Sequence, residues 1–241
     1  MAGKLKWMTL ICMGLMVWST PGDVAAPRTV AAIKADILAL SHSFVGQGDP
    51  DFTRQRALEV LVAELLAAAP QPPVKDRLDL LDGPWHQIWG PYDYRGGDRG
   101  TVDPKLTVDE IYQVVFREGY YYNVNPVRGK DRIALLRGEF QLVPGQPDML
   151  RARFTRFPGN KGRPADMPLW GLAALAEAGK LPAKTTIVPG FIVRWFFGGG
   201  VLREVYTDRD MRITYGGDRV DDRADEHIYI MTRPGAAAGR P

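Results

Sequence analysis

Apolar residues follow two different spacings along the chain, helical near the start and strand-like afterwards. Between residues 29 and 45, one face of a helix carries Ile33, Ile37, Leu40 and Phe44. Beyond the glycines at 46 and 48, Asp49 and Pro50 provide an N-cap and a first-turn proline for a second amphipathic helix, which ends before the prolines of 70–73. We expect both apolar faces to pack on the following domain; a face directed at a membrane or a partner protein is the alternative.

The chain from Leu80 onward consists of short β-like runs separated by glycine, proline and aspartate. Nine runs are predicted as strands: 85–92, 110–116, 119–125, 132–143, 149–157, 190–197, 201–206, 210–215 and 226–232. Since no helix alternates regularly with these runs, their order favours an antiparallel sheet that closes as a barrel. Only the segment 166–178 differs from its surroundings, and it predicts a short apolar helix inserted between strands.

The first 26 residues are typical of an export signal. Lys4 and Lys6 accompany an apolar run that extends to Trp18, and the small residues Ala25 and Ala26 follow. The run is shorter than the roughly 20 apolar residues that a transmembrane helix needs. We therefore predict a bacterial protein that is exported to the periplasm or associated with a membrane, with an uncleaved N-terminal anchor as the alternative.

Composition narrows the possible classes of protein. The 241 residues are 45% hydrophobic and 24% charged, which is typical of globular proteins and argues against disorder, coiled coil and collagen. The formal charge of +3 arises from interspersed residues, so no nucleic-acid partner is expected. A single cysteine, Cys12, excludes an intrachain disulfide and a multi-cysteine zinc site, and the three histidines lack metal-type spacing. We expect neither a metal nor a cofactor.

Four segments, in order, resemble the plastid lipid-associated protein (PAP)/fibrillin domain. The run 80–85 (LLDGPW) resembles the "LL.G.W" start of that domain, and Ile111-Tyr112-Gln113 with Asn123 and Asn125 is similar to its "YQ…N" segment. The run 205–213 (VYTDRDMRI) is similar to the "TYLD-DLRI" signature, and 228–233 to the closing strand. The chain departs from the family at Tyr215, where a second arginine is usual, and in the longer, more acidic segment 216–225.

The resemblance implies a mainly β fold: a lipocalin-like antiparallel β-barrel with two N-terminal helices packed on it and a short helical insert. It also implies binding or storage of small hydrophobic molecules such as isoprenoids, quinones or lipids. Residues 1–26 are then the export signal, 27–73 a helical preface, 74–233 the barrel and 234–241 a flexible tail.

The residues expected to bind a hydrophobic ligand are Trp85, Trp89, Tyr112, Gln113, Asn123, Phe154, Trp195, Phe197 and Arg212. In lipocalin-like barrels a tryptophan such as Trp85 closes one end and an arginine of a late strand covers its face; Arg212 is the matching candidate. Trp89 lies four residues further on, so a regular strand would place it on the same face as Trp85. Both tryptophans have a structural interpretation beside direct ligand contact.

Aromatic clusters at 120–122 and 195–197 are dense for a chain with 10% aromatic residues. They indicate either plain core or the wall of a cavity for an apolar ligand, which an eight-stranded or larger barrel is wide enough to hold. Gln113, Asn123 and Asn125 would orient a quinone or another polar head group near the mouth.

The apolar residues of the predicted insert are candidates for a lid or a membrane contact: Leu169, Trp170 and Leu172. Lysines and arginines flank this segment on both sides, which suits an anionic lipid surface. A connecting helix that merely packs on the barrel is the alternative.

Candidate catalytic groups are sparse. His86 and His227 would be candidates to meet if the first and last strands adjoin, as closure of a barrel requires. A serine partner is missing, since none of the three serines lies in the predicted barrel. The acids between 218 and 226 lack the spacing of an EF-hand, so a solvated loop is expected, with weak calcium binding as the alternative. We therefore expect no catalytic residues.

Taken together, these patterns predict an exported protein that binds, carries or stores a hydrophobic small molecule inside a barrel. The first alternative is a structural peripheral protein that coats a membrane or a lipid particle. An enzyme that acts on a bound lipid is the third interpretation.

Overall fold

The computed structural model describes residues 26–43, 52–90, 110–126, 132–161, 166–181, 186–188, 199–221 and 226–235. The helices are α1 (Val30–Ser43), α2 (Thr53–Ala68), the 3-10 helix η1 (Val74–Arg77), α3 (Leu78–Leu81) and α4 (Gly171–Glu177). The strands are β1 (Gly83–Trp89), β2 (Tyr112–Phe116), β3 (Tyr120–Pro126), β4 (Arg132–Leu142), β5 (Met149–Lys161), β6 (Thr186–Val188), β7 (Gly199–Thr207), β8 (Met211–Gly217) and β9 (His227–Thr232).

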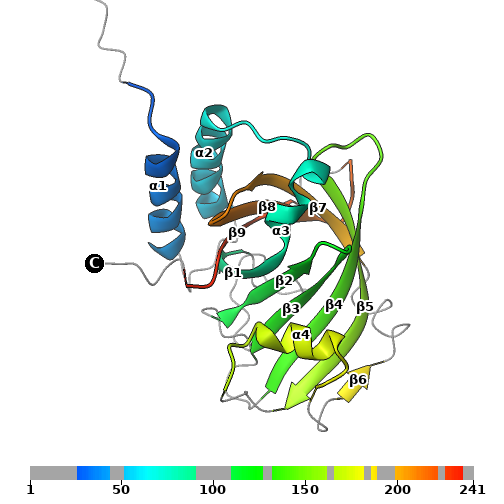
Figure 1. The fold of residues 1–241 in the computed structure, drawn as a ribbon. Helices are drawn as coiled ribbons and strands as arrows, with labels where there is room; N and C mark the ends of the chain where they lie inside the picture. Colours follow the sequence, from blue (N-terminus) through cyan, green and yellow to red (C-terminus); the bar gives the residue numbers. More distant parts are fainter. Residues whose placement is uncertain are drawn as a thin grey trace, which may run out of the picture.

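Eight of these strands form a closed antiparallel β-barrel in the order β1-β2-β3-β4-β5-β7-β8-β9 (Figure 1). The ring closes because β1 pairs with β9 as well as with β2, and β4 pairs with β5. The first part of β5 pairs with β7, whereas its last part continues past β7 and pairs with β6. The predicted fold, a lipocalin-like barrel carrying helices, is confirmed.

Eight of the nine predicted strands coincide with strands of the barrel. The ninth, 190–197, lies outside the described residues, as do nearly all of the predicted export signal and residues 236–241 of the predicted tail. The three-residue strand β6 was not expected, because so short a run carries no recognisable alternation.

Helices α1 and α2 cover the outer face of one side of the barrel, against β1, β7, β8 and β9 (Figure 1). Ile33 and Ile37 of α1 and Leu58 and Leu65 of α2 are at most 1% exposed there. Apolar residues spaced three and four apart lie on one face of a helix, which is why each helix buries a continuous stripe. The prediction that these helices pack on the barrel is confirmed.

A salt bridge fixes α1 to the turn between β7 and β8. The Nζ atom of Lys34 lies 2.6 Å from an oxygen of Asp208, which also accepts a hydrogen bond of 2.7 Å from the Tyr206 hydroxyl. The other Asp208 oxygen accepts the backbone N–H groups of Asp210 and Met211, both at 2.8 Å. Asp208 thus holds the turn together and ties it to α1.

This cluster predicts loss of stability in acid. Burial alone would raise the pKa of the Asp208 carboxyl, but the hydrogen bonds from Lys34, Tyr206 and the two backbone groups outweigh it and lower the pKa. A carboxyl whose pKa is lower in the folded state stabilises the fold above its unfolded pKa of about 3.9, and this contribution disappears as the pH falls through the folded value. In urea titrations at pH 7, we expect Asp208→Asn to lower the free energy of unfolding by about 1–2 kcal/mol. Equal stability of variant and wild type at pH 7 would contradict this role.

Helix α4 covers a different part of the outer face, over β2, β3 and β4. Leu172 and Ala173 are fully buried there, and Leu169 is 4% exposed. The side chain of Tyr122 fixes the end of the helix, because its hydroxyl donates a hydrogen bond of 2.8 Å to Glu177. The lid or membrane contact expected of Leu169 and Leu172 is therefore wrong: both are buried against the barrel, and α4 is the packed connecting helix. Trp170, half-buried, contacts the ring of Tyr112 at 5.3 Å.

The segment 74–81 closes one end of the barrel. Val74 and Leu81 belong to the same buried cluster as inward-facing residues of β1, β2, β3, β5 and β9. Arg77 is 2% exposed and donates hydrogen bonds to the Glu204 carbonyl at 2.5 Å and to the Thr207 hydroxyl at 3.2 Å. Burial lowers the pKa of Arg77, and the negative charges of Glu204 and Asp148 oppose that effect. We call this end of the barrel the closed end.

Candidate functional site

The barrel interior is filled near the closed end and partly accessible to solvent further along. Trp85, Tyr121, Leu150 and Met231 point inward near the closed end and are at most 3% exposed. Strand pairing and alternation place a second set of side chains inside the barrel beyond them, all of which keep partial exposure: Gln113, Asn123, Asn125, Phe154 and Tyr229. These partly exposed residues lie toward the end of the barrel that is opposite the closed end. We call this region the far half.

Gly138 makes room for the ring of Tyr121, which lies where the filled closed end meets the far half. Gly138 faces Tyr121 across the β3–β4 pair. A Cβ atom at Gly138 would lie 2.3 Å from the Tyr121 ring, closer than any side-chain contact allows. The Tyr121 ring therefore lies across the interior over the bare backbone of β4, edge-on to Phe154 at 6.2 Å. Burial raises the pKa of Tyr121 well above its ordinary value.

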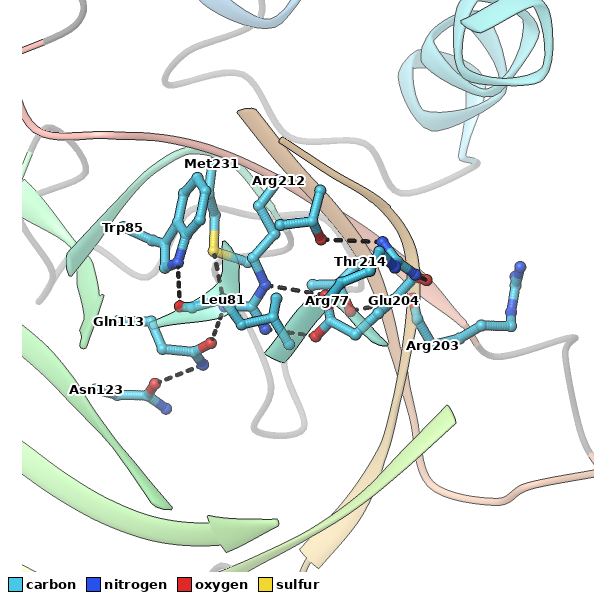
Figure 2. Close-up of polar contacts among 11 residues, drawn as sticks. Arg77, Leu81, Trp85, Gln113, Asn123, Arg203, Glu204, Arg212, Thr214 and Met231 are labelled. Carbon is cyan, nitrogen blue, oxygen red and sulfur yellow. Dashed lines mark hydrogen bonds and ion pairs between the residues drawn. The ribbon is translucent and has the colours of Figure 1, made fainter. Parts of the chain in front are cut away.

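A chain of polar side chains crosses the interior from β7 to β3 (Figure 2). Arg212 binds both carboxylate oxygens of Glu204, with Nη2–Oε1 at 2.5 Å and Nε–Oε2 at 3.0 Å. Its third nitrogen, Nη1, donates to Oε1 of Gln113 at 2.5 Å. Nε2 of Gln113 in turn donates to Oδ1 of Asn123 at 3.0 Å. We call these four residues the polar chain.

The ion pair within the polar chain is withdrawn from water. The side chains of Arg212 and Glu204 are 2% and 0% exposed. Removing two charges from water costs several kcal/mol each, and this cost is offset only where geometry is good and further hydrogen bonds are satisfied. The fork-shaped guanidinium meets both conditions here, because it binds the carboxylate at two points and Gln113 at a third.

Trp85 closes the barrel end as expected, but a different arginine covers it. Its indole is fully buried and Nε1 donates to the Leu81 carbonyl at 2.8 Å. The guanidinium of Arg233 lies 3.7 Å from the ring centroid. Burial, and then the positive charge of Arg212, lower the pKa of Arg233. The expectation that Arg212 covers Trp85 is wrong, because the Arg212 guanidinium is directed to Glu204 and Gln113.

Trp85 and Trp89 lie on opposite faces of β1, contrary to the prediction. The pairing of β1 with β9 shifts between Gln87 and Trp89, so that Ile88 is an extra residue without a partner. A β-bulge of this kind reverses the alternation of side chains beyond it. Trp89 therefore points outward and is buried under α1 and α2, not inside the barrel.

The other predicted ligand-binding residues are divided between the two faces. Phe154, Gln113, Asn123 and Arg212 face the interior. Tyr112 lies on the outer face, where its ring stacks on His86 at 5.0 Å, so its predicted contact with an interior ligand is wrong. Trp195 and Phe197 lie outside the described residues.

The two barrel histidines do not meet. β1 and β9 do pair, but His86 lies opposite Thr232, whereas His227 is at the other end of β9 and stacks on Phe52 at 5.4 Å. Of the acids in the predicted solvated loop, Glu226 is instead buried and paired with Arg203. Within the residues that the structure describes, no group of three or more histidine, cysteine, aspartate or glutamate side chains could hold a metal ion.

A groove of about 580 Å³ lies at the end of the β5–β7 pair, beside the turn that follows β8. Its residues include Arg151, Arg153 and Arg219, the acids Asp218 and Asp221, and the backbone of Gly199 and Gly200. It is separate from the polar chain, none of whose residues lines it.

Sequence reasoning missed Glu204 and Arg77. A signal for Glu204 was present, since it alternates with Leu202 in the run 201–206 and therefore belongs to the inward-facing set. An ionisable residue at such a position needs a buried partner. Arg77 gave no comparable signal, because it precedes the first predicted strand.

Comparisons with protein-family models, with curated proteins and with solved structures find no match for this chain. Of the helices that the structure describes, none combines the length and the apolar character needed to span a membrane.

Proposed function

We propose that the barrel binds a small hydrophobic molecule, such as an isoprenoid, a quinone or a lipid, and carries or stores it. The observation that carries this proposal is the closed barrel itself, whose interior presents the apolar side chains of Phe154 and Tyr229, partly exposed, beside the polar groups of Gln113 and Asn123. Apolar walls with a few fixed polar groups are typical of small-molecule sites. The resemblance to the PAP/fibrillin domain supports the same function, and residues 1–26 support action after export.

The hydrogen bonds of Glu204, the buried acid of the polar chain, favour binding over catalysis. Both oxygens of Glu204 are held by Arg212, so the carboxylate is not available to take a proton from a substrate. The surface-coat alternative loses part of its basis, because Leu169 and Leu172 are buried rather than presented to a membrane.

Two variants on neighbouring residues of β5 test the proposal. Ala152 faces the interior and Arg153 faces outward, so Ala152→Phe narrows the barrel whereas Arg153→Phe adds the same ring outside. Each protein is purified from the membrane-adjacent compartment of its host, and native mass spectrometry and solvent extraction identify any bound molecule. We expect a stoichiometric hydrophobic adduct on the wild type and on Arg153→Phe, and its loss from Ala152→Phe.

A fluorescent apolar probe, N-phenyl-1-naphthylamine, provides the second measurement, and the melting temperature shows whether each variant is folded. Equal probe binding by folded Ala152→Phe and by the wild type would contradict binding inside the barrel. An apo mass for the wild type, together with binding to liposomes, would favour the surface-coat function instead.

A further inference from the structure

The polar chain has a fixed direction. A guanidinium has only donors, so the atom of Gln113 that faces Arg212 must be the amide oxygen. The Gln113 nitrogen is then the atom that faces Asn123, and Asn123 must receive it with its own oxygen. The orientation of both amides therefore follows from the charge of Arg212, and the Asn123 nitrogen is the last donor of the polar chain.

This last donor has no protein partner among the described residues. Within the described part of the chain, the Asn123 side chain makes one hydrogen bond, which its oxygen accepts from Gln113. Figure 2 shows the Asn123 nitrogen turned away from Gln113. Asn123 is half-buried and faces the far half from β3. Its N–H groups are thus presented to the region where the proposed ligand would lie.

Two features make this donor a suitable recognition group. It is held in place, because Gln113 fixes the Asn123 amide and Arg212, which is paired with Glu204, fixes the Gln113 amide. A cation at the start of a hydrogen-bonded chain also polarises the groups that follow, which strengthens the last donor. The next inward residue of β3, Asn125, has a buried amide oxygen that accepts no hydrogen bond from the described part of the chain.

We infer that Asn123 donates a hydrogen bond to an acceptor oxygen of the ligand, and that the ligand is a hydrophobic molecule with a carbonyl group, as in a ketone, a quinone or an ester. This inference rests on the proposed function. A pure hydrocarbon would cover the Asn123 nitrogen without replacing its bonds to water, which costs free energy. A carbonyl oxygen accepts that bond and lets the remaining chain contact the apolar wall.

The test uses two probes of equal chain length, 2-tridecanone and tridecane, each displacing N-phenyl-1-naphthylamine from the full chain. We expect the wild type to bind the ketone about tenfold more tightly than the alkane. The variant Asn123→Leu removes the donor at nearly constant volume and should abolish this preference, mainly by weakening ketone binding. Asn123→Asp keeps the oxygen that Gln113 needs but has no N–H, so it should abolish the preference as well and serves as a second variant if Asn123→Leu fails to fold.

The outcomes separate this inference from the proposed function. If the wild type bound neither probe, and no apolar probe at all, the proposed function itself would be wrong. If it bound ketone and alkane equally, or if a folded Asn123 variant kept the preference for the ketone, barrel binding would stand and the role of Asn123 would be overturned.

Discussion

Replacing Arg212 by alanine is expected to lower the free energy of unfolding by about 3–5 kcal/mol, because it leaves the fully buried Glu204 carboxylate without a partner. The substitution also removes the donor that fixes Gln113. Urea denaturation at pH 7, followed by tryptophan fluorescence and by circular dichroism, measures the change. A loss below about 1 kcal/mol would show that the ion pair is not buried as described.

The double variant Arg212→Met, Glu204→Leu is the matched control for charge. Replacing a buried ion pair by apolar residues of similar volume is often neutral for stability, so we expect the double variant to recover most of the loss. It should not recover the preference of the far half for a ketone, because Gln113 and Asn123 are then free to reverse their amides. Stability and ligand preference would thus respond differently to the same two substitutions.

Replacing Trp85 by alanine is expected to cost about 3–5 kcal/mol of stability. The indole fills the barrel beside the segment 74–81, donates to the Leu81 carbonyl and carries the guanidinium of Arg233 on its face. Thermal unfolding monitored by circular dichroism gives the effect, and a melting temperature near that of the wild type would contradict the closure of this end by Trp85.

Two further variants are compared with Trp85→Ala in the same measurement of stability. Trp85→Phe keeps an aromatic ring under Arg233 but loses the bond to Leu81, and it should cost less than alanine. Trp170→Ala removes a half-buried tryptophan from the outer face near α4, where we expect a loss of about 1 kcal/mol. An equal loss for Trp85→Ala and Trp170→Ala would show that the closed end gains no special stability from its tryptophan.

The sequence predicted the architecture well because that architecture follows from alternation. The helical stripes that carry Ile33 and Leu58 are buried where expected, and the runs that became β1–β5 and β7–β9 alternate at period two. Prediction failed where alternation itself is interrupted. The extra residue Ile88 moves Trp89 to the outer face, and no pattern of residues in the run 85–92 predicts a bulge.

The candidate site was predicted only in part, because its residues meet through pairings between distant strands. Gln113 and Asn123 were expected near a ligand, and they do form a bonded pair. The partner of Arg212 was misassigned because its place on an inward face does not determine which inward residue its guanidinium contacts. Only the three-dimensional register shows that the guanidinium is directed at the carboxylate.

The pairing of β1 with β9 has a consequence for how the chain reaches this structure. The ring closes only when the last strand joins the first, so its final seam joins segments that are far apart in the chain, which slows folding. Helices α1 and α2, although they come first, bury their apolar stripes partly on β8 and β9 and have no complete surface to cover until those strands are in place. A nascent chain therefore cannot complete the ring until β9, which ends at Thr232, has been synthesised.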